Sequence, residues 1–138
     1  MVEIAAIYEG DLHCSVSHGP SGATLVTDAP ADNHGKGEGF SPTDLLASAL
    51  ATCILSVMAI AAKVMKVDLT GTTAVVHKDM VSKPVRRVGT LAVTITVPVV
   101  LDAAQRARLT TAAHGCPVHR SLHPDVSAPI VFVWPDVP

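Results

Sequence analysis

The chain has 138 residues, of which 49% are hydrophobic, 16% are charged and 3% are aromatic. This length suits one domain, and we expect a single domain over residues 1–138. A small domain has little interior in which to bury apolar residues. This high apolar content therefore favours a homodimer, in which a second copy covers part of the surface. The net charge of −2 argues against a nucleic-acid-binding protein. Residues 1–10 contain no basic stretch followed by an apolar run, which favours a cytoplasmic location.

The first third of the chain is predicted to form strands. Residues 4–8, 12–17 and 23–27 are strand-like, and turn signals separate them at residues 9–11 and 18–22. A loop follows over residues 29–39. Its segment Gly35 to Gly39 is not a phosphate-binding loop, because it lacks the strand-to-helix spacing and the Lys-Ser/Thr pair of such loops.

A long apolar helix is predicted to begin at Ser41 and to end near Lys66 or Val67. Ser41 can serve as its N-cap, Pro42 suits the first helical position, and Asp44 completes a short-acid variant of the capping box. The next segment, Leu45 to Ala62, has 18 residues without a charge, which is the lower limit for a membrane span. Because six of these residues are Ala and four are Ser, Thr or Cys, we interpret the segment as a helix of a soluble protein that is buried on all of its sides.

Apolar residues recur in this helix at spacings of three and four. This spacing predicts that Cys53 lies on a buried stripe. The stripe consists of Leu46, Leu50, Cys53, Val57, Ile60 and Val64.

The second half alternates between strands and helices. Residues 70–81 and 88–99 are β-rich, and the second run alternates so that one face of its strand is buried. Residues 102–113 are predicted to form an amphipathic helix that ends at Gly115. After it, Cys116 and Pro117 are predicted to open a short helical turn, and residues 127–133 to form a closing strand. The order of elements therefore predicts an α+β fold.

Cys53 and Cys116 are the residues best suited to chemistry, since cysteines of a cytoplasmic protein are more often reduced or catalytic than structural. Cys116 precedes a predicted helix, whose free N–H groups and dipole lower the pKa of a thiol. Apolar surroundings raise the pKa of a thiol at Cys53. Cys116 is therefore expected to be the more acidic thiol. Cys53 could have a purely structural role, since free cysteines are commonly buried. Cys14, in a predicted strand, is interpreted as a packing or surface residue.

Two separated motifs resemble the signatures of the OsmC/Ohr family of osmotically inducible and organic hydroperoxide resistance proteins. The run Gly39 to Leu46 (GFSPTDLL), followed by Cys53, resembles the first signature, and the run Cys116 to Leu122 (CPVHRSL) resembles the second. The order of elements matches over nearly the whole chain. This resemblance implies antiparallel sheets packed around a long buried central helix, in an intertwined homodimer whose active sites lie at the subunit interface.

The resemblance also implies a two-cysteine peroxidase cycle. Cys53 would attack the peroxide oxygen and become a sulfenic acid. Cys116 would resolve this acid to a disulfide, which an external dithiol reduces. Apolar walls around Cys53 would suit a small organic hydroperoxide, and the cycle needs no cofactor. The order of attack is taken from the family and not from the dipole argument.

The sequence departs from the peroxidase pattern at two positions. The family's activating arginine is missing, since no arginine precedes Arg86, and Thr43 stands where a glutamate is expected. The residues that could activate or support Cys53 are Asp44, Thr43, Lys36 and His119, with His18 or the Arg86 side chain of a second subunit as further substitutes. The departures motivate an alternative function: a non-peroxidase OsmC-like dimer that binds a small apolar ligand or senses redox state through Cys53.

The residue types of His114, Cys116, His119 and His123 suit zinc, and the last two histidines have i, i+4 spacing. However, Pro124 follows directly, and a metal ion on Cys116 would block its resolving role. We therefore predict no metal and interpret these histidines as polar residues that cap turns.

Overall fold

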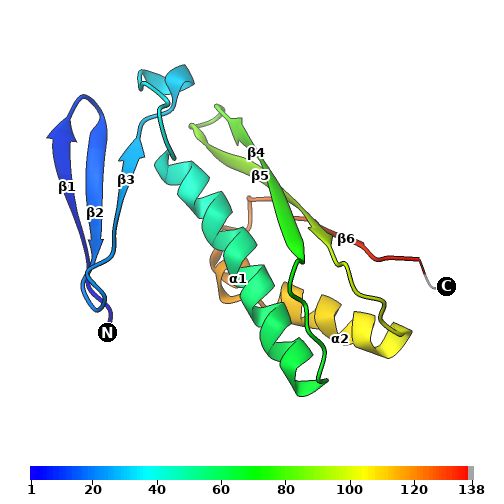
Figure 1. Cartoon of the computed structure of the whole chain (residues 1–138). Helices are drawn as coiled ribbons and strands as arrows, with labels where there is room; N and C mark the ends of the chain where they lie inside the picture. The colour runs from blue at the N-terminus through cyan, green and yellow to red at the C-terminus, as the bar shows by residue number, and fades with distance from the viewer. Residues whose placement is uncertain (137–138) are drawn as a thin grey trace. The chain divides into compact units, whose positions relative to one another are not determined.

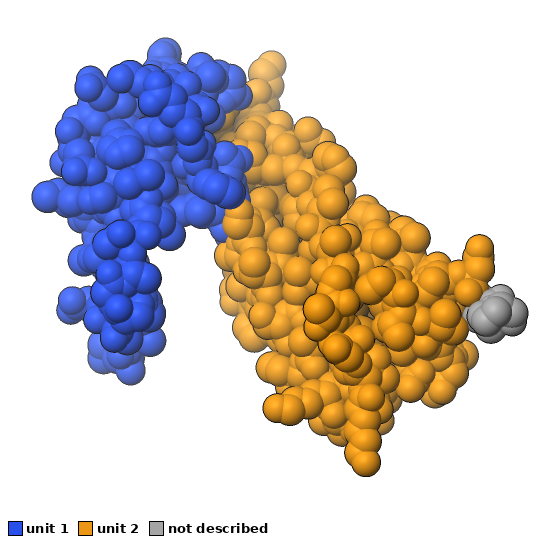
Figure 2. Space-filling model, in the orientation of Figure 1, with its two compact units in different colours: residues 1–46 blue, residues 47–138 orange. Residues whose placement is uncertain are grey.

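The computed structural model describes residues 1–136, and the chain divides into two compact units, Met1–Leu46 and Ala47–Pro138 (Figure 2). The elements are of the α+β class, as the sequence predicted. Each unit contains one three-stranded sheet.

The first unit contains strands β1 (Ile4–Gly10), β2 (His13–His18) and β3 (Thr24–Asp28), in the order β1-β2-β3 (Figure 1). Both pairs are antiparallel, and all three strands lie where the sequence predicted them. The predicted loop follows β3 and contains a short 3-10 helix, η1 (Ala31–Asn33). Gly35 is required in this loop, because a Cβ at that position would overlap the Ala29 carbonyl group.

The register of this sheet gathers apolar side chains on one face. Tyr8 is paired with Cys14, and Val16 is paired with Leu25, so these residues point to the same side. The side chains of Ile4, Tyr8 and Leu25 on this side are 58%, 63% and 45% exposed. Within the first unit this face is therefore an uncovered apolar surface.

The long helix α1 (Pro42–Val64) begins as predicted. The Ser41 N–H donates to Asp44 Oδ2 at 2.9 Å, and the Asp44 N–H donates to Ser41 Oγ at 3.1 Å, which is the reciprocal capping box. Lys66 adopts a left-handed φ of 58°, and the Val67 N–H bonds back to the Ala62 carbonyl at 2.9 Å. The helix therefore ends within three residues of the predicted end.

The predicted buried stripe of α1 is wrong in its phase. Leu50 of the predicted stripe is 0% exposed, but Ile60 and Val64 are 67% and 73% exposed. Ile54 and Met58, which lie outside the predicted stripe, are 0% exposed. Cys53 is half-buried, so it lies beside the buried stripe and not on it. Because α1 is apolar around most of its circumference, several stripes have the same spacing and the sequence could not choose between them.

The interpretation of α1 as buried on all sides is also wrong for the single chain. The helix is long and apolar enough to cross a membrane by length and composition, and 28% of its apolar window is buried within the described chain. The rest of the window is half-buried or exposed within residues 1–136.

The second sheet consists of β4 (Thr73–Val81), β5 (Arg87–Thr96) and β6 (Ile130–Val133), in the order β4-β5-β6. β4 and β5 are antiparallel, but β6 runs parallel to β5, which corrects the expectation of purely antiparallel sheets. A parallel pair needs a long crossover connection, and helices α2 (Ala103–His114) and α3 (Pro117–Ser121) supply it.

The core of the second unit lies on one face of β5. As the alternation predicted, Leu91, Val93, Ile95 and Val97 are at most 2% exposed. Leu109 and Ala113 of α2 are 0% exposed, as are three apolar residues of α1. α1 and the β4–β5 hairpin run in nearly the same direction (Figure 1). The central part of α1, which carries Cys53, is therefore held by this core.

Candidate functional site

Cys116 is fixed by the tight link between α2 and α3. The Gly115 N–H donates to the Thr111 and Ala112 carbonyls, both at 3.1 Å, and the Cys116 N–H donates to the Ala113 carbonyl at 3.2 Å. Pro117 occupies the start of α3, so Cys116 becomes its N-cap residue. The Cys116 side chain is 0% exposed, and its Sγ accepts a hydrogen bond from the His119 N–H at 3.5 Å.

The structure brings Cys53 and Cys116 together. Cys53 lies near enough to Cys116 to raise the pKa of its thiol, although the residues come from α1 and from the α2–α3 link, 63 positions apart in the sequence. Both cysteines are free thiols, as is the half-buried Cys14 of β2. The site therefore combines one buried thiol, Cys116, with one half-buried thiol, Cys53.

Cys116 is not the acidic thiol that its place at the start of a helix predicted. Burial raises the pKa of Cys116, and the neighbouring Cys53 thiol raises this pKa further, whereas the N–H groups of His119 and Val118 lower it. The effect of burial on the pKa of Cys116 is larger than that of the helix dipole, because α3 has five residues and is too short for a large dipole.

The predicted supporting residues have mostly structural contacts. Asp44 and Thr43 belong to the cap of α1, since the Asp44 carboxylate accepts from the Ser41 N–H and Thr43 Oγ1 lies 3.2 Å from Ser41 Oγ. Lys36 is exposed in the loop of the first unit. His119 contacts Cys116 through its backbone N–H, while its ring Nε2 lies 3.0 Å from the Ala128 carbonyl oxygen.

The histidines near Cys116 are bonded to the backbone. His114 Nδ1 lies 2.9 Å from the Thr110 carbonyl oxygen, and the Asp125 N–H donates to His123 Nδ1 at 3.1 Å. Within residues 1–136 no group of three or more His, Cys, Asp or Glu side chains is placed to hold a metal ion. These contacts agree with the interpretation of the histidines as polar residues that stabilise turns.

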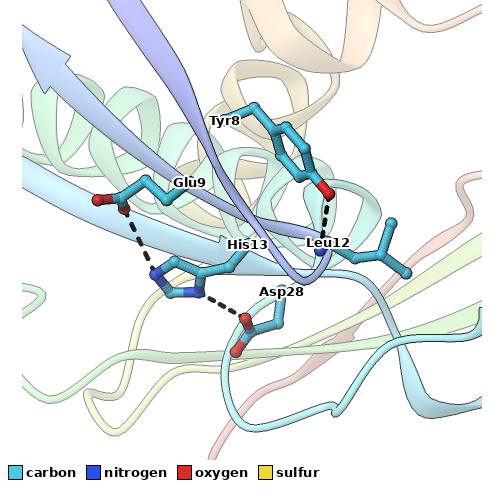
Figure 3. A network of polar contacts seen from close by, with 5 residues as sticks. All are labelled: Tyr8, Glu9, Leu12, His13 and Asp28. Carbon is cyan, nitrogen blue, oxygen red and sulfur yellow. Dashed lines mark hydrogen bonds and ion pairs between the residues drawn. The ribbon is translucent and has the colours of Figure 1, made fainter.

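Sequence reasoning missed a polar cluster in the first unit (Figure 3). His13 Nδ1 donates to Asp28 Oδ1 at 2.6 Å, and His13 Nε2 lies 3.6 Å from Glu9 Oε1. The hydrogen bond to Asp28 raises the pKa of His13 above its ordinary 6.5, burial opposes this, and the charges of Asp28, Glu9 and Glu38 add to it. The only signal was the β2–β3 pairing, which places His13 directly opposite Asp28.

Comparison with protein families gives one match. A family model described as OsmC-like protein matches residues 35–129, a range that includes both cysteines of the pair. No protein with a curated description matches the chain.

Solved structures match the chain over nearly its whole length. One is a protein from Psychrobacter arcticus 273-4 that was proposed to be induced by osmotic stress and to act in a detoxification response. It is 43% identical, covers 96% of each chain and has a TM-score of 0.90. An organic hydroperoxide resistance protein OsmC from Legionella pneumophila is 17% identical over 96% of each chain, with a TM-score of 0.78. An OsmC-like protein from Mycoplasma pneumoniae is also 17% identical, over 97% of this chain and 96% of its own, with a TM-score of 0.77.

Proposed function

This chain belongs to the OsmC-like family, and from that premise we propose that it is a thiol-dependent peroxidase that reduces organic hydroperoxides. The observation that carries the proposal is that Cys53 and Cys116, from the two matched motifs, lie near enough for Cys53 to raise the pKa of the Cys116 thiol. Similar folds occur in proteins described as organic hydroperoxide resistance proteins, which supports the class of substrate.

In the proposed cycle Cys53 reacts first and Cys116 resolves. Cys53 is the more accessible of the two, since it is half-buried while Cys116 is 0% exposed. The raised pKa of Cys116 also favours this order, because the thiolate and not the thiol is the nucleophile. The sulfenic acid formed at Cys53 would lie within reach of Cys116, so that a disulfide forms, and an external dithiol then restores both thiols.

The substrate is proposed to be a small apolar hydroperoxide. Cys53 is next to fully buried apolar residues of α1, such as Ile54, and the exposed side of the helix carries Ile60. Apolar walls bind an alkyl or aryl group better than they bind the strongly hydrated hydrogen peroxide.

We also propose that the active form is a cytoplasmic homodimer. Large apolar side chains are exposed in each unit of the chain, among them Ile7 and Tyr8 at 63% each and Val64 at 73%. A monomeric soluble protein rarely exposes large contiguous apolar patches, so a second copy is the natural covering for the apolar sides of β1–β3 and α1. Light scattering during gel filtration tests this proposal, which predicts twice the mass of 14.3 kDa.

The peroxidase proposal is tested by peptide mapping. Reduced protein is treated with one equivalent of cumene hydroperoxide, alkylated and digested without a reductant. The proposal requires a Cys53–Cys116 disulfide that disappears when a dithiol is added. Cys14→Ser is the matched control, since it removes a thiol outside the pair and should leave the disulfide intact. A persistent absence of this disulfide after peroxide treatment would contradict the two-cysteine cycle.

One sequence observation favours a second function. No arginine precedes Arg86, so the family's usual activating cation for Cys53 is missing. The alternative is a dimer of the same fold that binds a small apolar ligand near Cys53 or senses redox state through it. Native mass spectrometry of purified protein distinguishes the two, since a retained apolar ligand favours binding and a ligand-free protein with rapid turnover favours the peroxidase.

A further inference from the structure

The position of the Cys116 sulphur depends on a very short helix. α3 has five residues, and so short a helix keeps its shape only through contacts with the rest of the fold. Cys116 Sγ accepts from the His119 N–H at 3.5 Å, which is the bond that an N-cap side chain makes to the third residue of its helix. Whatever holds His119 in place therefore also holds the Cys116 sulphur.

The ring of His119 is anchored outside α3. Its Nε2 lies 3.0 Å from the Ala128 carbonyl oxygen. Because a carbonyl oxygen can only accept a hydrogen bond, Nε2 carries the hydrogen and donates it. The side chain of His119 is half-buried, so this bond is partly shielded from competing water.

The anchor belongs to a segment that the second sheet holds firmly. Two N–H groups of β5 donate to the carbonyls on either side of Ala128, to the Ser127 carbonyl at 2.8 Å and to the Pro129 carbonyl at 2.9 Å. Successive carbonyls of an extended segment point in opposite directions, so the Ala128 carbonyl points away from β5. His119 supplies the donor for that carbonyl and thereby ties the start of α3 to the sheet.

On the basis of the function proposed above, we propose that His119 is a positioning residue for the resolving step. Its ring holds α3 against the segment beside β5, and its backbone N–H holds the Cys116 sulphur. In the resolving step Cys116 loses its proton, and its sulphur attacks the sulphur of the Cys53 sulfenic acid. The S–S bond forms, the S–O bond breaks, and the departing hydroxide takes up the proton from Cys116 and leaves as water.

The two steps of the cycle depend differently on this arrangement. The first step uses Cys53 of α1, which neither contact of His119 touches. The second step uses Cys116, and a displacement of a reacting group by about 1 Å can slow a reaction by up to about 100-fold. The loss of the His119 ring should therefore slow the second step and leave the first unchanged.

The test measures the lifetime of the Cys53 sulfenic acid in a single turnover. Reduced protein is mixed with one equivalent of cumene hydroperoxide and quenched at increasing times with dimedone, which traps the sulfenic acid. Mass spectrometry then measures the Cys53 adduct and the Cys53–Cys116 disulfide. In His119→Ala the sulfenic acid should form at the wild-type rate and persist about 10- to 100-fold longer. This lifetime is a first-order quantity, so a smaller amount of folded protein does not alter it.

Two further variants make the test specific. His119→Gln should restore most of the wild-type lifetime, because the glutamine amide can donate to the Ala128 carbonyl in place of Nε2. His123→Ala is the matched control. This neighbouring histidine is exposed, and its Nδ1 accepts from the Asp125 N–H, so its removal should leave the lifetime unchanged.

The outcomes separate this inference from the proposed function. The positioning role is overturned while the peroxidase function stands if His119→Ala leaves the lifetime unchanged, if His119→Gln is as slow as His119→Ala, or if His123→Ala is equally slow. If Cys53 of the wild type reacts with the peroxide no faster than a free cysteine, the peroxidase function itself fails, and the positioning role fails with it.

Discussion

Two isoleucines of α1 give a sharp test of whether a second copy covers this helix. Ile54 is 0% exposed within the chain, and Ile60 is 67% exposed. Ile54→Ala leaves a cavity in the core, and such changes cost about 2–5 kcal/mol per chain. We expect a loss of about 3 kcal/mol in the free energy of unfolding.

The cost of Ile60→Ala depends on the covering. Fully burying an isoleucine side chain is worth about 1.5–3 kcal/mol, so covering the two thirds that are exposed is worth about 1–2 kcal/mol. If Ile60 stayed in water, the substitution would cost less than about 0.5 kcal/mol. With a second copy on α1, we predict a loss of about 1 kcal/mol or more per chain.

Urea denaturation at protein concentrations spanning two orders of magnitude measures both effects. The unfolding midpoint of a dimer rises with protein concentration, and both variants should keep this dependence. The reasoning is refuted if Ile54→Ala has the expected cost but Ile60→Ala costs less than about 0.5 kcal/mol at every concentration. In that case the exposed side of α1 lies outside the interface.

Three further predictions concern single contacts. The raised pKa of His13 means that its contact with Asp28 stabilises the fold fully below pH 6.5, and this contribution is lost as the pH rises through the folded-state pKa. The stability difference between wild type and His13→Gln, measured by urea denaturation, should therefore shrink from acidic to alkaline pH; a constant difference would contradict the ion pair. Arg106 lies 5.4 Å from the ring centroid of Trp134 and donates to the Leu101 carbonyl at 3.0 Å, so Arg106→Gln should lower stability by about 1 kcal/mol. It should also shift the fluorescence of Trp134, and an unchanged spectrum would argue against this stacking. Asp102 accepts from the Gln105 N–H at 2.8 Å, so Asp102→Ala should cost about 1 kcal/mol in thermal denaturation, and Asp102→Asn should restore most of it.

The sequence predicted the elements because their signals are local. The capping pattern contains Ser41 and Asp44, which form the reciprocal bonds of the α1 cap, and the alternation in β5 indicates its buried residues directly. Turn residues separated β1, β2 and β3 correctly for the same reason.

The site was predicted less completely, because its properties depend on long-range packing. The motifs selected Cys53 and Cys116, but the pKa of Cys116 is set by burial and by Cys53, neither of which its neighbours in the sequence reveal. Likewise the contact of His13 with Asp28 depends on strand register. The phase of the buried stripe on α1 was ambiguous because nearly every face of the helix is apolar.

The measurement that tests the central claim most directly is thiol loss in stopped-flow mixing of fully reduced protein with cumene hydroperoxide and, separately, with hydrogen peroxide. The variants Cys53→Ser and Cys116→Ser are measured alongside. The account predicts rapid loss of the Cys53 and Cys116 thiols with the organic peroxide, slower loss with hydrogen peroxide, and no rapid loss in Cys53→Ser. Thiol loss no faster than that of a free cysteine, and equal in wild type and Cys53→Ser, would contradict it.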